Sequence, residues 1–133
     1  MMSAAESPFV SPENRAWAEA AERGVLLLKH CRVCGRNHYY PRPFCPFCFS
    51  EDVEDLAATG EGRIYTFTVN RTQPELRINA YVTLADGPTI MTEIVGADPD
   101  AVKIGNEVTL AFRSSAMGFP APVFQLKRSV VEP

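Results

Sequence analysis

All four cysteines of the chain lie between residues 31 and 48, in two Cys-x-x-Cys pairs separated by ten residues: Cys31, Cys34, Cys45 and Cys48. Two such pairs, each on a tight turn, can supply the four thiolates that a structural zinc site takes in a tetrahedron. Gly35 directly follows the second cysteine and suits such a turn. We therefore predict one zinc ion per chain. Iron held by the same thiolates, or a pair of disulfides, are the alternatives.

The compartment in which these thiols fold bears on the choice between metal and disulfide. The N-terminal stretch MMSAAESPFVSPENR lacks a basic region followed by an apolar segment, so no secretory signal is expected. No apolar run approaches the roughly 20 residues that a membrane span needs. We expect a cytoplasmic protein without membrane association, in which thiols stay reduced and cysteine pairs favour metal.

Basic side chains gather around the cysteines. Residues 25 to 50 contain no acidic residue, but they hold four cations and two histidines: Lys29, His30, Arg32, Arg36, His38 and Arg42. The cations can balance the net charge of about −2 that zinc carries with four thiolates, or their surplus can face a phosphate. Both explanations stay open. Neither histidine is expected to bind the metal, because four cysteines complete its coordination.

The remaining composition argues against several functional classes. The formal net charge of −3 and the pI of about 5.4 make nucleic-acid binding unlikely. The sequence has no HExxH, G-x-S-x-G, Walker or dinucleotide-binding motif. Glu93 is expected on a solvated strand face. The aromatic residues near the cysteines are expected to form the small core of the cysteine-rich segment: Tyr39, Tyr40, Phe44, Phe47 and Phe49. The sequence therefore indicates a binding or assembly module.

A short helix is expected before the cysteines. Ser11 and Pro12 predict its start, Gly24 predicts its end, and Trp17 lies with alanines on one face. So short a helix must dock on something, either its own domain or a partner subunit. Residues 1 to about 10 are expected to be a loose tail, GVLLLKH a buried strand that leads into Cys31, and SEDVEDL an acidic connector.

Five strands are expected after this connector. GRIYTFTVNR alternates with Tyr65, Phe67 and Val69 on one face, and NAYVTLADGPTIMTEIVG predicts a hairpin at Asp86-Gly87. DPDAVKIG predicts one helical turn, and NEVTLAFR and APVFQLKR predict two more strands. A helical turn between the third and fourth of five strands favours an OB-fold barrel over a sandwich fragment or an SH3-like barrel.

The predicted fold class is therefore mainly β: a short N-terminal helix, a cysteine-bound ribbon and a five-stranded OB-fold barrel. The predicted organisation is a tail and helix in residues 1–24, a zinc ribbon in residues 25–54 and the OB-fold domain in residues 55–133.

Several stretches of the sequence resemble those of a known family. GVLLLKHCRVCGRNHYYPRPFCPFC, GEGRIYTFTVNR and VKIGNEV closely resemble the acyl-CoA-associated OB-fold family, in which a rubredoxin-like zinc ribbon precedes an OB domain. The likeness runs from Ser11 to about Val123. It implies that Cys31, Cys34, Cys45 and Cys48 bind zinc, and it includes Gly60–Gly62 at the entry to the barrel. Members of the family accompany thiolase-like enzymes and aldolases, and are thought to complete an acyl-CoA site.

The resemblance implies a non-catalytic subunit that associates with a thiolase-like or aldolase enzyme and helps to bind acyl-CoA. Under this hypothesis Lys29, Arg36 and Arg42 would face the phosphates of CoA. Two departures stand out: Phe49 replaces the usual glycine after the last cysteine, and the loop NRTQPELRINA lacks the usual proline-aromatic sequence. The alternatives are a single-stranded nucleic-acid-binding module and, against the missing catalytic motifs, an independent hydrolase or lyase.

Overall fold

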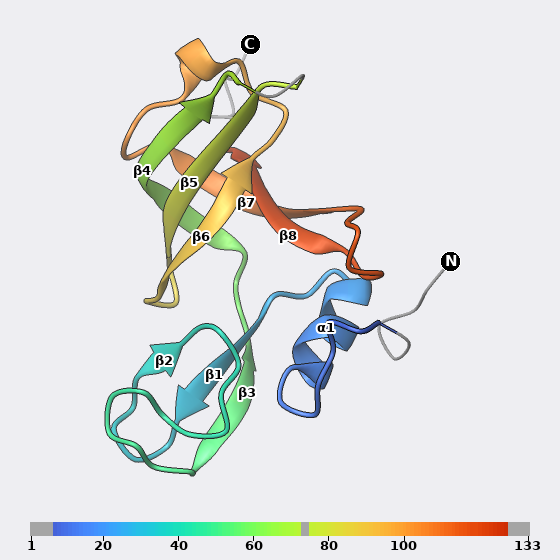
Figure 1. Cartoon of the computed structure of the whole chain (residues 1–133). Helices are drawn as coiled ribbons and strands as arrows, with labels where there is room; N and C mark the ends of the chain where they lie inside the picture. The colour runs from blue at the N-terminus through green and yellow to red at the C-terminus, as the bar shows by residue number, and fades with distance from the viewer. Residues whose placement is uncertain (1–6, 73–74, 128–133) are drawn as a thin grey trace.

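The computed structural model describes residues 7–72 and 75–127, and its strands form two sheets that lie one after the other along the chain (Figure 1). A three-stranded sheet has the order β2-β1-β3, and a closed barrel has the order β4-β5-β6-β8-β7. The elements are α1 (Arg15–Glu22), β1 (Leu27–Cys31), β2 (Asn37–His38), β3 (Val53–Ala57), β4 (Glu61–Asn70), β5 (Arg77–Leu84), β6 (Thr89–Ile94), the 3-10 turn η2 (Pro99–Ala101), β7 (Glu107–Arg113) and β8 (Ala121–Leu126).

The barrel has the connectivity of an OB-fold. All its strand pairs are antiparallel except β6 with β8, which run parallel and meet at Ile94 and Phe124. β7 closes the barrel against the start of β4. The turn η2 lies between β6 and β7, and the Asp98 side chain caps it by accepting a hydrogen bond from the Asp100 N–H. This arrangement confirms the predicted OB-fold, including the hairpin at Asp86-Gly87 between β5 and β6.

The first barrel strand contains a bulge that the sequence did not indicate. The pairing of β4 with β5 shifts between Ile64, opposite Val82, and Thr66, opposite Tyr81. Ile64 is 2% exposed and Phe67 packs against the core, whereas Tyr65 is 66% exposed. The prediction that Tyr65 shares the inner face with Phe67 is wrong, because the extra residue reverses the alternation at this point.

One continuous apolar core joins the two sheets. Leu26, just before β1, and Leu28, within β1, belong to the same buried cluster as Val82, Val108 and Phe124 of the barrel. Each is at most 1% exposed, and full burial of such a side chain stabilises a fold by about 1.5–3 kcal/mol. The predicted boundary between residues 54 and 55 falls within β3, which runs from one sheet towards the other.

The helix α1 packs on its own chain. Trp17, Ala18 and Ala21 are buried against Phe119, from the loop between β7 and β8. The predicted start at Pro12 is wrong, since the helix begins at Arg15 and residues 11–14 form a turn. The Asn14 side chain draws this turn together: its Oδ1 accepts from the Ser11 N–H at 2.7 Å.

The segment before this turn is also packed. Of the predicted loose tail, residues 1–6 lie outside the described residues. Ser7 is buried and its hydroxyl donates to the Met117 carbonyl, and Val10 packs against the cluster around Trp17. The prediction of a loose tail is therefore wrong for residues 7–10. Across residues 7–72 and 75–127, no helix is long and apolar enough to cross a membrane.

Candidate functional site

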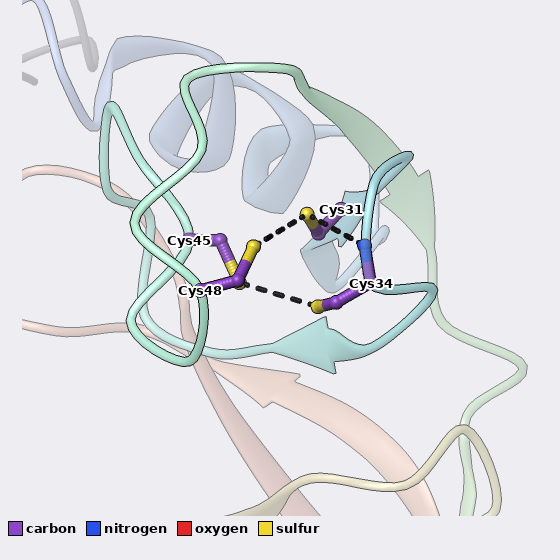
Figure 2. Close-up of side chains that lie close together, drawn as sticks. All are labelled: Cys31, Cys34, Cys45 and Cys48. Carbon is purple, nitrogen blue, oxygen red and sulfur yellow. Dashed lines mark hydrogen bonds between the residues drawn. The ribbon is translucent and has the colours of Figure 1, made fainter.

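The four cysteine sulfurs converge on one point, as Figure 2 shows. All four lie within 4.8 Å of one another, and the pairs Cys31–Cys48 and Cys34–Cys45 are each separated by 3.6 Å. A tetrahedron with zinc–sulfur bonds of about 2.3 Å places its sulfurs roughly 3.8 Å apart. The sulfur atoms therefore have the spacing of a four-coordinate metal centre. Cys31 and Cys45 are buried, whereas Cys34 and Cys48 are exposed.

Backbone N–H groups favour the thiolate form of Cys31 and Cys45, the two buried cysteines of this centre. The Cys34 N–H lies 3.5 Å from the Cys31 sulfur, and the Phe47 N–H lies 3.4 Å from the Cys45 sulfur. The pKa of Cys31 is lower than that of an ordinary thiol, chiefly because of the hydrogen bond from Cys34. Burial raises the pKa of Cys45, but the backbone N–H groups of Cys48 and Phe47 outweigh it and the pKa falls to about 7. Thiolates are the form that binds metal.

With all four cysteines placed around one centre, the site has no open position for substrate or activated water. Such a centre stabilises a small fold and does not carry out a reaction. Zinc bound here would cross-link the turn after β1 to the turn that contains Cys45 and Cys48, and would hold the ribbon in one conformation.

The third strand of the ribbon neutralises half of the cations near the cysteines. β3 was predicted as an acidic connector, but it pairs antiparallel with β1. Asp55 lies opposite Lys29, with 2.6 Å between the carboxylate and Nζ. Arg32 forms ion pairs with Asp52 and Glu54, with 3.2 Å between the guanidinium nitrogen and the carboxylate oxygen in each pair. The acid-free segment thus receives its counter-charges from residues 52–55, just beyond its end.

Arg36 and Arg42 are the two cations of this group that stay exposed and without a carboxylate partner among residues 7–72 and 75–127. The Arg36 guanidinium lies 4.9 Å from the centre of the Phe47 ring, a cation–π contact. Arg36 and Phe47 also line a groove between the ribbon and the β5–β6 hairpin, together with Gly35, Asn37, Asp86, Gly87, Pro88 and Thr89. The Asn37 side-chain amide donates to the Asp86 carbonyl at 2.8 Å and joins the two walls of the groove.

His38 is the buried polar side chain of the ribbon. It is 3% exposed, and neither ring nitrogen has a hydrogen-bond partner within the part of the chain that the structure describes. Burial lowers the pKa of His38, and the nearby charges of Arg42 and Lys29 lower it further. The ring is therefore neutral near pH 7. The other ribbon histidine, His30, instead makes a contact of 2.6 Å with Asn37.

The aromatic residues of the ribbon do not form its core as expected. Tyr39 packs against the main core, and Tyr40 packs edge-on against Trp17 with a ring separation of 4.8 Å. In contrast Phe44, Phe47 and Phe49 are 37%, 50% and 73% exposed. The prediction is wrong for these three, because the shared core is filled instead by leucines of the ribbon strands and by barrel residues.

Glu93 also differs from expectation. Its side chain is 16% exposed and forms ion pairs with two arginines: Arg113 at 2.9 Å and Arg77 at 3.6 Å. Glu93 therefore shares the outer face of β6 with the exposed Met91, but the two arginines partly cover it. Of the loop predicted to differ from the family pattern, residues 73 and 74 lie outside the described residues, and Arg71 is exposed.

Comparison with known proteins assigns the two parts of the chain separately. Residues 18–54 match the rubredoxin-like zinc ribbon domain of ChsH2, and residues 56–113 match its C-terminal OB-fold domain. A DUF35 domain-containing scaffold protein of Methanothermobacter thermautotrophicus is 33% identical over 106 residues, which cover 74% of this chain and 80% of the relative. The chain belongs to the ChsH2/DUF35 family. The predicted resemblance is confirmed, and the four clustered cysteines lie in the part that matches the zinc ribbon.

Two solved structures place the family resemblance in three dimensions. A chain of the Ltp2-ChsH2(DUF35) aldolase superposes with a TM-score of 0.78 at 31% identity, covering 90% of this chain and 98% of that chain. A DUF35 protein of Sulfolobus solfataricus has a TM-score of 0.67 at 13% identity, over 90% of this chain and 89% of that chain, and shares the fold. These matches include ribbon and barrel together.

A further relative is much longer than this chain. The probable enoyl-CoA hydratase alpha subunit of Thermomonospora curvata is 31% identical over 123 residues, which cover 89% of this chain. This chain spans 39% of the length of that relative. The ChsH2/DUF35 family therefore includes chains in which the ribbon and barrel form only part of a larger protein.

Proposed function

We propose that this ChsH2/DUF35 protein is an accessory, non-catalytic subunit of a thiolase-like or aldolase enzyme, and that it helps to form the acyl-CoA site of that enzyme. The observation that carries the proposal is the match along nearly the whole length of one chain of an aldolase that contains Ltp2 and ChsH2. The closed four-cysteine centre supports a structural role for the metal.

The exposed arginines support the acyl-CoA part of the proposal. Arg36 stands beside a groove, its guanidinium is free of carboxylates among the described residues, and its planar fork suits the phosphates of CoA. Arg42 adds a second exposed charge. Lys29, the third predicted residue, pairs with Asp55, so its contribution requires sharing or breaking that ion pair.

The groove offers only one wall of such a site. It is open and lies between the first cysteine turn and the β5–β6 hairpin, with Arg36 as its cation. CoA should therefore bind weakly to the isolated subunit and better to the complex, where the enzyme supplies the other wall. The acyl group and its chemistry would belong to the enzyme subunit.

Single-stranded nucleic acid is the second candidate. Tyr65 and Tyr81 are 66% and 46% exposed on the barrel, and exposed aromatic rings can stack on bases. The cations of the barrel weaken this candidate: Arg63 pairs with Glu107, and Arg77 and Arg113 share Glu93. Phosphates would have to compete with these carboxylates.

The test begins with co-expression of the chain with an Ltp2-type aldolase subunit, followed by size-exclusion chromatography with light scattering. CoA affinity is then measured for the chain alone, for the complex and for the complex with Arg36→Glu. We expect the affinity of the complex to fall about tenfold, because one charge-assisted contact is reversed. Arg71→Glu changes the net charge equally on the β4–β5 loop and should leave the affinity unchanged.

Three outcomes would contradict the proposal. If Arg36→Glu and wild type bind CoA equally at low salt, the arginine does not face CoA. If a single-stranded oligonucleotide binds the isolated chain more tightly than CoA binds the complex, the nucleic-acid function takes its place. Turnover of an acyl-CoA by the purified chain alone would refute the non-catalytic role.

A further inference from the structure

The two cysteine turns have the same backbone structure. In the first, the Gly35 N–H donates to the Cys31 carbonyl at 2.9 Å; in the second, the Phe49 N–H donates to the Cys45 carbonyl at 2.8 Å. The Cys31 N–H donates to the Arg36 carbonyl at 2.9 Å, and the Cys45 N–H donates in the same way to the Ser50 carbonyl at 2.8 Å. Gly35 and Phe49 thus occupy equivalent positions.

Both positions require a positive φ, but only one has the residue that suits it. Gly35 has a φ of 77° and Phe49 has a φ of 66°. Glycine adopts this conformation readily, whereas for a bulky side chain it is a genuine outlier. In the part of the chain that the structure describes, Phe49 is the sole residue other than glycine with a positive φ. The second turn is therefore built with a residue that its own backbone disfavours.

Burial does not compensate for this conformation. Phe49 is 73% exposed, and the ring contact recorded for it is a tilted one with Phe44, at 6.2 Å between centroids. Strained residues that the packing of the fold does not repay tend to occur at functional positions. The large apolar side chain of Phe49 therefore serves something other than the stability of this chain.

Both turns carry further exposed apolar side chains besides Phe49. Val33 and Phe47 occupy the same place within their Cys-x-x-Cys pairs and are 66% and 50% exposed, and Phe44 is 37% exposed. We call Val33, Phe44, Phe47 and Phe49 the knuckle patch. Exposed apolar side chains grouped in this way mark interaction sites, and phenylalanine with arginine is enriched at protein interfaces.

We propose that the knuckle patch is the surface through which this chain docks on its enzyme subunit, with Phe49 as the central anchor. The inference rests on the proposed function, because it names the contact surface of that same partner. Charge defines what the partner must offer. From residue 32 to residue 50 the chain has three arginines and no acid, and Arg36 and Arg42 have no carboxylate partner among the described residues. The complementary surface is an apolar pocket bordered by carboxylates.

This placement is consistent with the groove beside Arg36. Phe47 belongs to the knuckle patch and also lines the groove. The Arg36 guanidinium makes its cation–π contact with the Phe47 ring. An enzyme subunit seated on the patch would therefore extend over the edge of the groove. The groove would then be closed from the side that the isolated chain leaves open.

The test compares binding and stability for Phe49→Gly. Glycine suits the positive φ, so the melting temperature and the zinc content should equal or exceed those of wild type. Affinity for the co-expressed Ltp2-type subunit should fall by about tenfold or more, as expected when an interface anchor is removed. Ile104→Ser is the matched control, since Ile104 is 68% exposed and lies in the barrel between η2 and β7. This control should bind as wild type does.

Each other outcome identifies which statement fails. If wild type binds the enzyme subunit and Phe49→Gly binds it equally well, the docking surface is wrong and the proposed function stands. If Phe49→Gly loses zinc or melts at a lower temperature, Phe49 is structural and the docking role is refuted. If the chain instead forms a homodimer that Phe49→Gly dissociates, the patch joins two copies. If wild type binds no enzyme subunit, the proposed function itself fails.

Discussion

Replacing Cys45 with serine tests how far the metal centre supports the rest of the molecule. Cys45 is fully buried, and its sulfur lies 3.6 Å from that of Cys34. A serine hydroxyl is a poor substitute for a thiolate, because zinc in structural sites is held by cysteine and histidine. The variant therefore has three thiolates around a centre built for four, and zinc should be lost or bound much more weakly.

The expected loss of stability follows from two terms. Zinc contributes about 10–16 kcal/mol to the folding of small zinc-binding peptides, which is more than so small a ribbon can lose and stay folded. If the ribbon unfolds, the barrel loses Leu26 and Leu28, each 1% exposed, from the shared core. At about 1.5–3 kcal/mol each, this weakens the barrel by roughly 3–6 kcal/mol, against typical total stabilities of about 5–15 kcal/mol. The barrel should remain folded but melt at a lower temperature.

The single tryptophan reports on this change. Trp17 is 6% exposed and contacts rings from two different regions: Tyr40 of the ribbon at 4.8 Å and Phe119 of the β7–β8 loop at 5.3 Å. Loss of the ribbon removes the Tyr40 contact, so the fluorescence of Trp17 should shift to longer wavelength. Circular dichroism should meanwhile keep the signal of the barrel strands, and metal analysis should find less than one zinc per chain.

Wild-type protein stripped of zinc by a chelator is the control, and re-addition of zinc should restore its fluorescence and melting temperature. The reasoning is refuted if the stripped protein and Cys45→Ser both keep the Trp17 emission and the melting temperature of the zinc-bound protein. Complete loss of the circular dichroism signal of the strands would contradict the estimated weakening of the barrel, since it would mean that the barrel cannot fold without the ribbon.

The remaining predictions concern which side chains of β4 point into the barrel, and the buried His38. Ile64→Ala should lower the free energy of unfolding by about 2–5 kcal/mol, whereas Tyr65→Ser should change it by less than about 0.5 kcal/mol; equal effects in denaturant melts would argue against the bulge. Burial, with the charges of Arg42 and Lys29, puts the folded-state pKa of His38 below the ordinary value of 6.5. The unfolded chain then takes up the proton more readily, so stability present above pH 6.5 is lost as the pH falls through 6.5 towards the folded-state pKa. His38→Gln should show a smaller loss of melting temperature between pH 7.5 and 5.5, and identical slopes would contradict this.

Features with a local physical cause could be predicted from the sequence. The cysteine pairs supply all the ligands of their own site, and Asp86-Gly87 specifies a tight hairpin through its own backbone preferences. Asp98 before Pro99 likewise caps a helical turn within three residues. These signals together were enough to predict the ribbon, the barrel and the order of its elements.

Features that depend on a partner strand could not be predicted in this way. The bulge at Tyr65 exists because β4 shifts its register against β5, and the alternation of β4 alone does not reveal the shift. The pairing of Lys29 with Asp55 requires β3 to lie beside β1, so counting charges along the sequence overestimated the free cations. The positive φ of Phe49 was not predicted either, although the glycine that the family usually has at this position is a sequence signal for it.

The packing of Trp17 against Phe119 also determines the order in which the molecule can mature during synthesis. The two residues lie near opposite ends of the chain, and β8, which completes the barrel, follows Phe119. On the ribosome the ribbon has all its strands and cysteines once residue 57 has emerged, so it can take up metal early. The helix that precedes it can then pack its indole against Tyr40, but it lacks the second ring, Phe119, until the last loop is made. During synthesis, the N-terminal helix therefore completes its packing only after the β7–β8 loop has been made.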